Sequence, residues 1–120
     1  MVSNATVPGF TTLPASLSPA IMAELRTTLG FHGLVMTDSL SAGAISAAGF
    51  SVPAAAVQAL KAGADIVMFG LPATTAATVS QTFAIRSAIV SAVAKGTLAR
   101  SRLIAAVDAV LAARHVNLCG

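Results

Sequence analysis

The feature that most constrains the fold is a unit that occurs twice along the chain. Each copy is a helix-forming stretch, a glycine that ends it, and a short run of apolar residues: Gly30 precedes residues 34–37, and Gly63 precedes residues 66–69. Runs that are apolar throughout are typical of strands in a parallel sheet covered on both faces. Strands that alternate with helices indicate right-handed parallel βαβ units. The sequence therefore predicts an α/β fold with parallel strands.

Local signals predict the other elements. Residues 1–5 resemble the tail of a buried strand, and Ser18, followed by proline, is suited to begin a helix. Ile21, Leu25 and Leu29 repeat every four residues, which predicts one apolar face on this helix. Further helices are expected over residues 53–61, 75–94 and 100–114. The strands are then expected near residues 1–5, 33–37 and 65–69, side by side in chain order.

The three predicted strands are too few for a complete domain of parallel strands and helices. The 120 residues allow one domain at most. Three short parallel strands would leave both sheet edges open, whereas a closed eight-stranded barrel needs about 250 residues. We therefore expect the last three βα units of a larger array, followed by C-terminal helices.

Composition excludes several classes of function. Charged residues make up 9% of the chain and the net charge is only +3, from scattered side chains, and Trp and Tyr are absent, so nucleic-acid binding is not expected. Glycine, proline and threonine interrupt the long uncharged stretches, so no membrane span is expected. The two histidines and single cysteine lack the spacing of metal ligands, and no glycine-rich phosphate loop occurs, so no metal or cofactor is expected. The low charge indicates a surface covered by other protein.

Asp38 is the first candidate for chemistry. It is one of four carboxylates in the chain and directly follows the first apolar run. A charged group there is costly unless it is used or satisfied, and the C-terminal ends of parallel strands are where catalytic groups gather. Alternatively, Asp38 caps a short helix that begins at Ser39. The residues alone leave both interpretations open.

Several motifs, taken in order, resemble family 3 glycoside hydrolases, most closely the β-N-acetylhexosaminidases. They are Pro-Ala-Ser-Leu-Ser at residues 14–18, Leu-Gly-Phe-His-Gly-Leu-Val-Met-Thr-Asp-Ser-Leu at 29–40, Ala-Gly-Ala-Asp at 62–65, and Lys-Gly-Thr-Leu at 95–98 with the helix after it. The resemblance runs along the whole chain. It implies a TIM-type (β/α)8 barrel of which residues 1–120 form a C-terminal fragment, the last three βα units.

The resemblance also implies an activity. Asp38 matches the family's nucleophile, so the complete enzyme is expected to hydrolyse terminal β-linked N-acetylglucosamine with retention of configuration. Asn4 stands where the family commonly has histidine; it is a candidate sugar contact, although a turn amide is equally compatible. Ala42 replaces a common methionine, which leaves substrate preference open. The family's acid/base loop has no counterpart in the chain, so the isolated chain is expected to be inactive.

Two other functions remain open at this point. Some family members use phosphate as the acceptor, so a glycoside phosphorylase is an alternative. A non-catalytic fragment that associates with itself is another.

Within the chain, His32 is not the missing acid/base. It precedes the strand that Asp38 follows, so a strand length of about 13 Å separates the two side chains. Asp65 enters the next strand from the same end as His32 and is expected to be structural.

Overall fold

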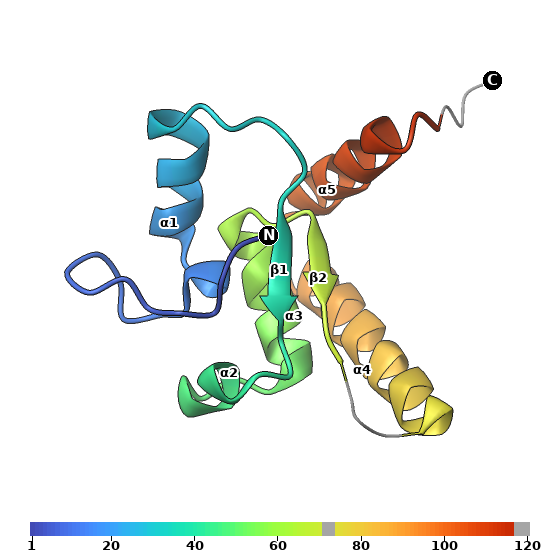
Figure 1. The fold of residues 1–120 in the computed structure, drawn as a ribbon. Helices are drawn as coiled ribbons and strands as arrows, with labels where there is room; N and C mark the ends of the chain where they lie inside the picture. The colour runs from blue at the N-terminus through green and yellow to red at the C-terminus, as the bar shows by residue number, and fades with distance from the viewer. Residues whose placement is uncertain (71–73, 117–120) are drawn as a thin grey trace.

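The computed structural model describes residues 1–70 and 74–116. Short helical turns precede the first strand, and the two longest helices close the chain (Figure 1). The elements are, in chain order, the 3-10 turn η1 (Ala15–Leu17), α1 (Pro19–Ala23), the π-helical turn η2 (Glu24–Thr28), β1 (Met36–Ser39), α2 (Gly43–Ala47), α3 (Val52–Ala62), β2 (Ile66–Met68), α4 (Thr75–Ala94) and α5 (Arg100–Ala113).

The strands are parallel, as predicted. β1 and β2 form a two-stranded sheet. The expected first strand is reduced to a single parallel bridge between Val2 and Thr37. Val2 donates its N–H to the carbonyl of Met36 (2.8 Å) and accepts from the N–H of Asp38 (2.8 Å). The spatial order of the three segments is therefore the predicted one, although only two of them are strands.

β1 lies two to three residues later than the sequence predicted. The carbonyl of Val35 accepts the N–H groups of Asp65 (2.8 Å) and Ile66 (3.1 Å), so regular pairing with β2 begins only at Met36. The apolar residues identified the buried segment, but the bounds of the strand depend on which backbone groups pair with β2. As a result, Asp38 lies inside β1 and not after it.

β1 also contains an irregularity that the apolar pattern did not reveal. Met36 pairs with Ile66 and Ser39 with Met68, so three steps on β1 match two on β2. The Oγ1 atom of Thr37 accepts the N–H of Met68 (3.0 Å) in place of a backbone carbonyl. An extra residue of this kind bends a strand and redirects its side chains, commonly near active sites.

α3 has the bounds predicted for it to within one residue at each end. Ser51 accepts the N–H of Ala54 (3.4 Å) as its N-cap. Gly63 ends the helix with φ 125°, and a Cβ there would lie 3.3 Å from the Cβ of Met22. Both backbone conformation and close approach therefore require glycine.

The helix that begins after Ser18 differs from the prediction. Ser18 does cap it, accepting the N–H of Ile21 (3.4 Å). From Glu24 onward the turns widen, and the N–H of Leu29 bonds back to Glu24, five residues earlier (3.0 Å). Leu29 is consequently 69% exposed, and Met22, at 2%, carries the buried contact. The predicted stripe holds at Leu25, which packs against the core, and fails at Leu29 because the π-helical turns rotate Leu29 off the packed face.

The core lies between α3 and the strands. Alanines of α3 approach the sheet closely because they have no bulky side chain, and α3 also packs against α4, η1, α1 and α5. The main cluster is Leu17, Met22, Val35, Leu40, Ile45, Ala55, Ala56, Ala59, Ala62, Ala64 and Ile85.

The sheet is covered on one face within the described residues. Figure 1 shows α3 behind β1 and β2, and no helix is drawn in front of them. Met36, Ile66 and Met68 are half-buried and belong to neither core cluster. Within the described residues, the predicted cover is therefore present on one face only.

α4 is a 20-residue helix that packs on α3 but remains largely exposed. Val79, Phe83 and Val90 are exposed on it. With 20 residues and a mean hydropathy of 1.2, it is long and apolar enough to cross a membrane, a feature that the sequence analysis did not anticipate. One such helix is weak support for a span, because helices of water-soluble proteins can be as long and as apolar.

Candidate functional site

Asp38 lies next to the C-terminal end of β1 and is half-buried. Its backbone N–H is bonded to Val2, and its Oδ1 atom accepts the N–H of Ser39 (2.7 Å). Its Oδ2 atom has no hydrogen-bond partner among the described residues. The carboxylate is therefore oriented by one backbone donor, and its second oxygen can still accept a hydrogen bond or react with a bound molecule.

Asp38 does not cap a helix. The next helix, α2, begins at Gly43, and its N-cap is Ala42, which makes no side-chain capping bond. Residues 39–42 form the end of the strand and a turn. The alternative interpretation of Asp38 as an N-cap is thus removed, because its carboxylate bonds to the very next residue.

Asn4 lies beside the residue that follows Asp38. Asn4 is 5% exposed. The Nδ2 group donates to the carbonyl of Ser39 (2.6 Å), and the Oδ1 atom accepts from the hydroxyl of Ser16 (2.5 Å). The structure thus brings Asn4 to the backbone of Ser39, the residue after Asp38 and 35 positions away in sequence. A direct sugar contact through Asn4 stays a prediction.

Asn4 also borders an open groove of about 490 Å³ between the N-terminal loop and α2. The groove walls are small residues and threonines: Asn4, Ala5, Thr6, Thr12, Pro14, Ala44, Ala47 and Ala48. Asp38 is not among them. The groove therefore does not contain the carboxylate.

Ser41 is a polar residue of this region that the sequence analysis missed. Its Oγ atom is buried and has no hydrogen-bond partner among the described residues. Buried hydroxyls without a partner are uncommon, because each costs free energy of desolvation. The only sequence signal was its position in the Asp-Ser-Leu-Ser turn after the strand.

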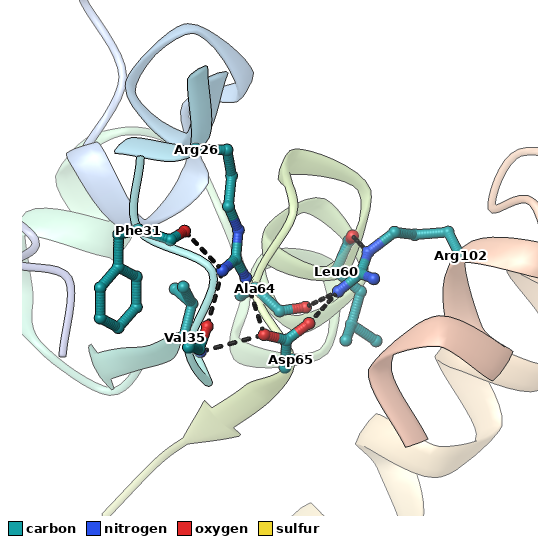
Figure 2. Close-up of polar contacts among 8 residues, drawn as sticks. Arg26, Phe31, Val35, Leu60, Ala64, Asp65 and Arg102 are labelled. Atoms are coloured by element: carbon teal, nitrogen blue, oxygen red, sulfur yellow. Dashed lines mark hydrogen bonds and ion pairs between the residues drawn. The ribbon is translucent and has the colours of Figure 1, made fainter. Parts of the chain in front are cut away.

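The opposite end of the sheet holds a second carboxylate, Asp65, in a closed network (Figure 2). Its side chain is only 4% exposed. Oδ2 accepts from Arg26 (2.9 Å) and from the N–H of Val35 (3.0 Å), and Oδ1 accepts from Arg102 (2.6 Å). This supports the structural interpretation of Asp65.

The two arginines extend that network to four segments of backbone. Arg26 also donates to the carbonyls of Phe31 (3.0 Å) and Gly33 (2.6 Å). Arg102 also donates to the carbonyls of Leu60 (3.1 Å) and Ala64 (2.6 Å). Asp65 therefore ties η2, the entry to β1, the end of α3 and α5 together. Partners 37 and 39 residues apart could not be paired from sequence.

No second proton-transfer group accompanies Asp38 within the described ranges. Glu24 accepts from Thr28 in η2 (2.9 Å), and Asp108 is exposed on α5. His32 is exposed before β1, at the end of the strand away from Asp38, as predicted. Across residues 1–70 and 74–116, no three His, Cys, Asp or Glu side chains are grouped to hold a metal ion.

Comparison with known proteins gives one family. The family model described as "Glycosyl hydrolase family 3 N terminal domain" matches residues 1–113. No curated protein matches the chain.

Solved structures also resemble the chain, and two of them are described as family 3 enzymes. A glycosyl hydrolase of the GH3 family from Mycobacterium smegmatis is 34% identical, with a TM-score of 0.74 over 88% of this chain and 32% of its own. A family 3 β-N-acetylglucosaminidase from Paenibacillus sp. FPU-7 is 35% identical, with a TM-score of 0.72 over 85% of this chain and 18% of its own. The β-glucoside phosphorylase BglX shares the fold, at 24% identity and a TM-score of 0.68 over 88% of this chain and 17% of its own. The chain spans at most about a third of these proteins.

Proposed function

The chain belongs to glycosyl hydrolase family 3, and from this premise we propose that Asp38 is the nucleophile of a retaining glycoside hydrolase. One observation carries the proposal. The carboxylate lies at the C-terminal end of a parallel strand, where barrel enzymes hold their chemistry, and one of its oxygens has no partner among the described residues. The hydrogen bond from the N–H of Ser39 orients the carboxylate through Oδ1 and leaves Oδ2 available to react.

The chemistry follows from that geometry. Oδ2 of Asp38 attacks the anomeric carbon and forms a glycosyl ester, while the leaving oxygen takes a proton from a second group. Water, activated by the same second group, then attacks the anomeric carbon from the face opposite the ester bond, and that bond breaks to release the carboxylate. Two inversions give net retention. The second group comes from outside the described residues.

The complete barrel is part of the proposal. We place the three segments around Val2, β1 and β2 as the last three strands of a TIM-type (β/α)8 barrel. The sheet face without a helix and the small share of the relatives' length support this placement. The isolated chain then lacks the acid/base and most of the sugar site, so it is expected to be inactive.

The proposed substrate is a terminal β-linked N-acetylglucosamine residue. The support is the 35% identity to the Paenibacillus β-N-acetylglucosaminidase, together with the sequence motifs. Asn4, which borders the groove, is the candidate sugar contact that the sequence predicted, although both polar atoms of its side chain already have partners within the protein.

Phosphorolysis is the second candidate. It is supported by the shared fold of the β-glucoside phosphorylase, in which phosphate in place of water would accept the glycosyl group. A third candidate is a non-catalytic fragment that associates with itself, which the exposed apolar residues of α4 support. The first two candidates share Asp38, and the third does not need it.

The test is a complete barrel in which residues 1–113 replace the matching segment of the M. smegmatis hydrolase. We expect this hybrid to release nitrophenol from 4-nitrophenyl N-acetyl-β-glucosaminide and to produce free sugar in phosphate buffer. Accumulation of the sugar 1-phosphate would instead identify a phosphorylase. A folded hybrid with no turnover of any β-glycoside would contradict the proposed function, and size-exclusion of the 120-residue chain measures its self-association.

A further inference from the structure

We propose that Asn4, supported by Ser16, is a positioning residue that sets the orientation of the Asp38 carboxylate. This inference rests on the proposed role of Asp38 as nucleophile. It assigns Asn4 a task that acts through the protein backbone, where the resemblance suggested a direct sugar contact.

A continuous series of hydrogen bonds joins Ser16 to Asp38. The hydroxyl of Ser16 donates to Oδ1 of Asn4 (2.5 Å), and Nδ2 of Asn4 donates to the carbonyl of Ser39 (2.6 Å). The N–H of Ser39 in turn donates to Oδ1 of Asp38 (2.7 Å). Each bond is short, and the series passes through the backbone of Ser39, whose carbonyl and N–H belong to adjacent peptide units.

The peptide unit between Ser39 and Leu40 is held from both sides. Its carbonyl accepts from Asn4, and its N–H donates to the carbonyl of Met68 (2.8 Å). The N–H of Asp38 is separately bonded to Val2. With both neighbouring positions fixed, the N–H of Ser39 has one direction, and that direction determines where the carboxylate points.

Asn4 is itself rigidly placed. The residues on either side of it, Ser3 and Ala5, accept backbone N–H groups from Ser16 (2.9 Å) and Ala15 (2.9 Å) of η1. Its side chain and that of Ser16 are both buried. Each side-chain polar atom of this buried pair has a partner, which favours one geometry because other arrangements leave buried groups unsatisfied.

The effect should appear in catalysis as turnover and not as binding. Displacing a reacting group by about 1 Å can lower a rate by roughly 10²-fold. Asn4→Asp replaces the donor to Ser39 with an acceptor, so it should lower kcat of the hybrid barrel about 10- to 100-fold and change KM less than about 3-fold. Ser16→Ala keeps that donor but removes its support, and should give a smaller loss of kcat.

The matched control is Gln58→Ala. Gln58 also donates a side-chain amide to a distant backbone carbonyl, that of Leu17 (3.0 Å), but has no bond to the Asp38 region. It should lower stability comparably and leave kcat unchanged. If Asn4→Asp and Gln58→Ala give the same kcat, or if Asn4→Asp raises KM alone, the positioning role is wrong.

A spectroscopic measurement on the 120-residue chain separates this inference from the proposed function. Side-chain couplings of Asp38 measured by NMR should show one dominant rotamer, which Asn4→Asp averages and Gln58→Ala preserves. Unchanged Asp38 couplings in Asn4→Asp would overturn the inference even if Asp38 is the nucleophile. Near-normal turnover in Asp38→Asn would overturn the proposed function, and a changed rotamer would then still establish the orienting contact.

Discussion

The two ends of the sheet hold one aspartate each, and they differ in how completely the protein satisfies the carboxylate. Asp65, before β2, receives two arginines and a backbone N–H, so both oxygens are occupied. Asp38, near the end of β1, receives one backbone N–H. In the sequence, both are single aspartates next to an apolar run, and the structure separates them by how their oxygens are bonded. A buried carboxylate with both oxygens paired stabilises the fold, whereas a carboxylate with one unpaired oxygen is available to a substrate.

The largest expected effect is on activity and tests the open end of the sheet. Asp38→Asn preserves size and removes the nucleophile, so kcat/KM of the hybrid barrel should fall by roughly 10³-fold or more. Its urea midpoint should stay close to that of the parent, because Asp38 makes one side-chain hydrogen bond. A loss of stability matching the loss of activity would mean that Asp38 is structural like Asp65.

The next effect is on stability and tests the closed end. Asp65→Asn leaves Arg26 and Arg102 without their counter-charge, and removing one partner of a buried ion pair costs about 3 kcal/mol. Urea unfolding of the 120-residue chain measures this directly. The control is Asp108→Asn on the exposed surface of α5, which should change the free energy of unfolding by less than about 0.5 kcal/mol. Equal effects would show that the Asp65 network adds nothing.

The strand irregularity before Asp38 gives an intermediate effect. Thr37→Val keeps the shape but leaves the N–H of Met68 without its acceptor, which should cost about 2 kcal/mol of unfolding free energy. Thr37→Ser keeps the hydroxyl and should lose less. If valine and serine behave alike in urea unfolding, the hydroxyl does not support the bent strand.

The smallest effect concerns Ser41. Its buried Oγ has no partner among the described residues, so Ser41→Ala should leave the stability of the 120-residue chain unchanged or raise it by up to about 1 kcal/mol. Ser46→Ala serves as the comparison, because its hydroxyl is exposed and bonded locally to Gly43 (2.9 Å). A clear loss of stability in Ser41→Ala would show that the region around Asp38 is as fully satisfied as that around Asp65.

Local signals allowed much of the fold to be predicted. Gly63 marked the end of α3, and the ranges of α3, α4 and α5 were predicted to within a residue at each end. Parallel pairing followed from the alternation of strands and helices. These features depend on neighbours in sequence, which a single chain displays.

Features that depend on distant partners were not predictable. The shift of β1 comes from pairing with residues about 30 positions away, and the widened turns of η2 have no residue signature. The candidate site shows the same division. Asp38 was recognisable as an isolated acid after an apolar run, but the bonds from Asn4 to Ser39 and from Arg102 to Asp65 link residues 35 and 37 positions apart.

The most direct test of the central claim is covalent trapping of Asp38. A fluorinated N-acetylglucosaminide that forms its glycosyl ester quickly and releases it slowly would be incubated with the hybrid barrel, and the labelled peptide mapped by mass spectrometry. We expect the mass increase on Asp38, with no label on Asp65 and none in Asp38→Asn. A label on any other residue, or normal labelling of Asp38→Asn, would contradict the account.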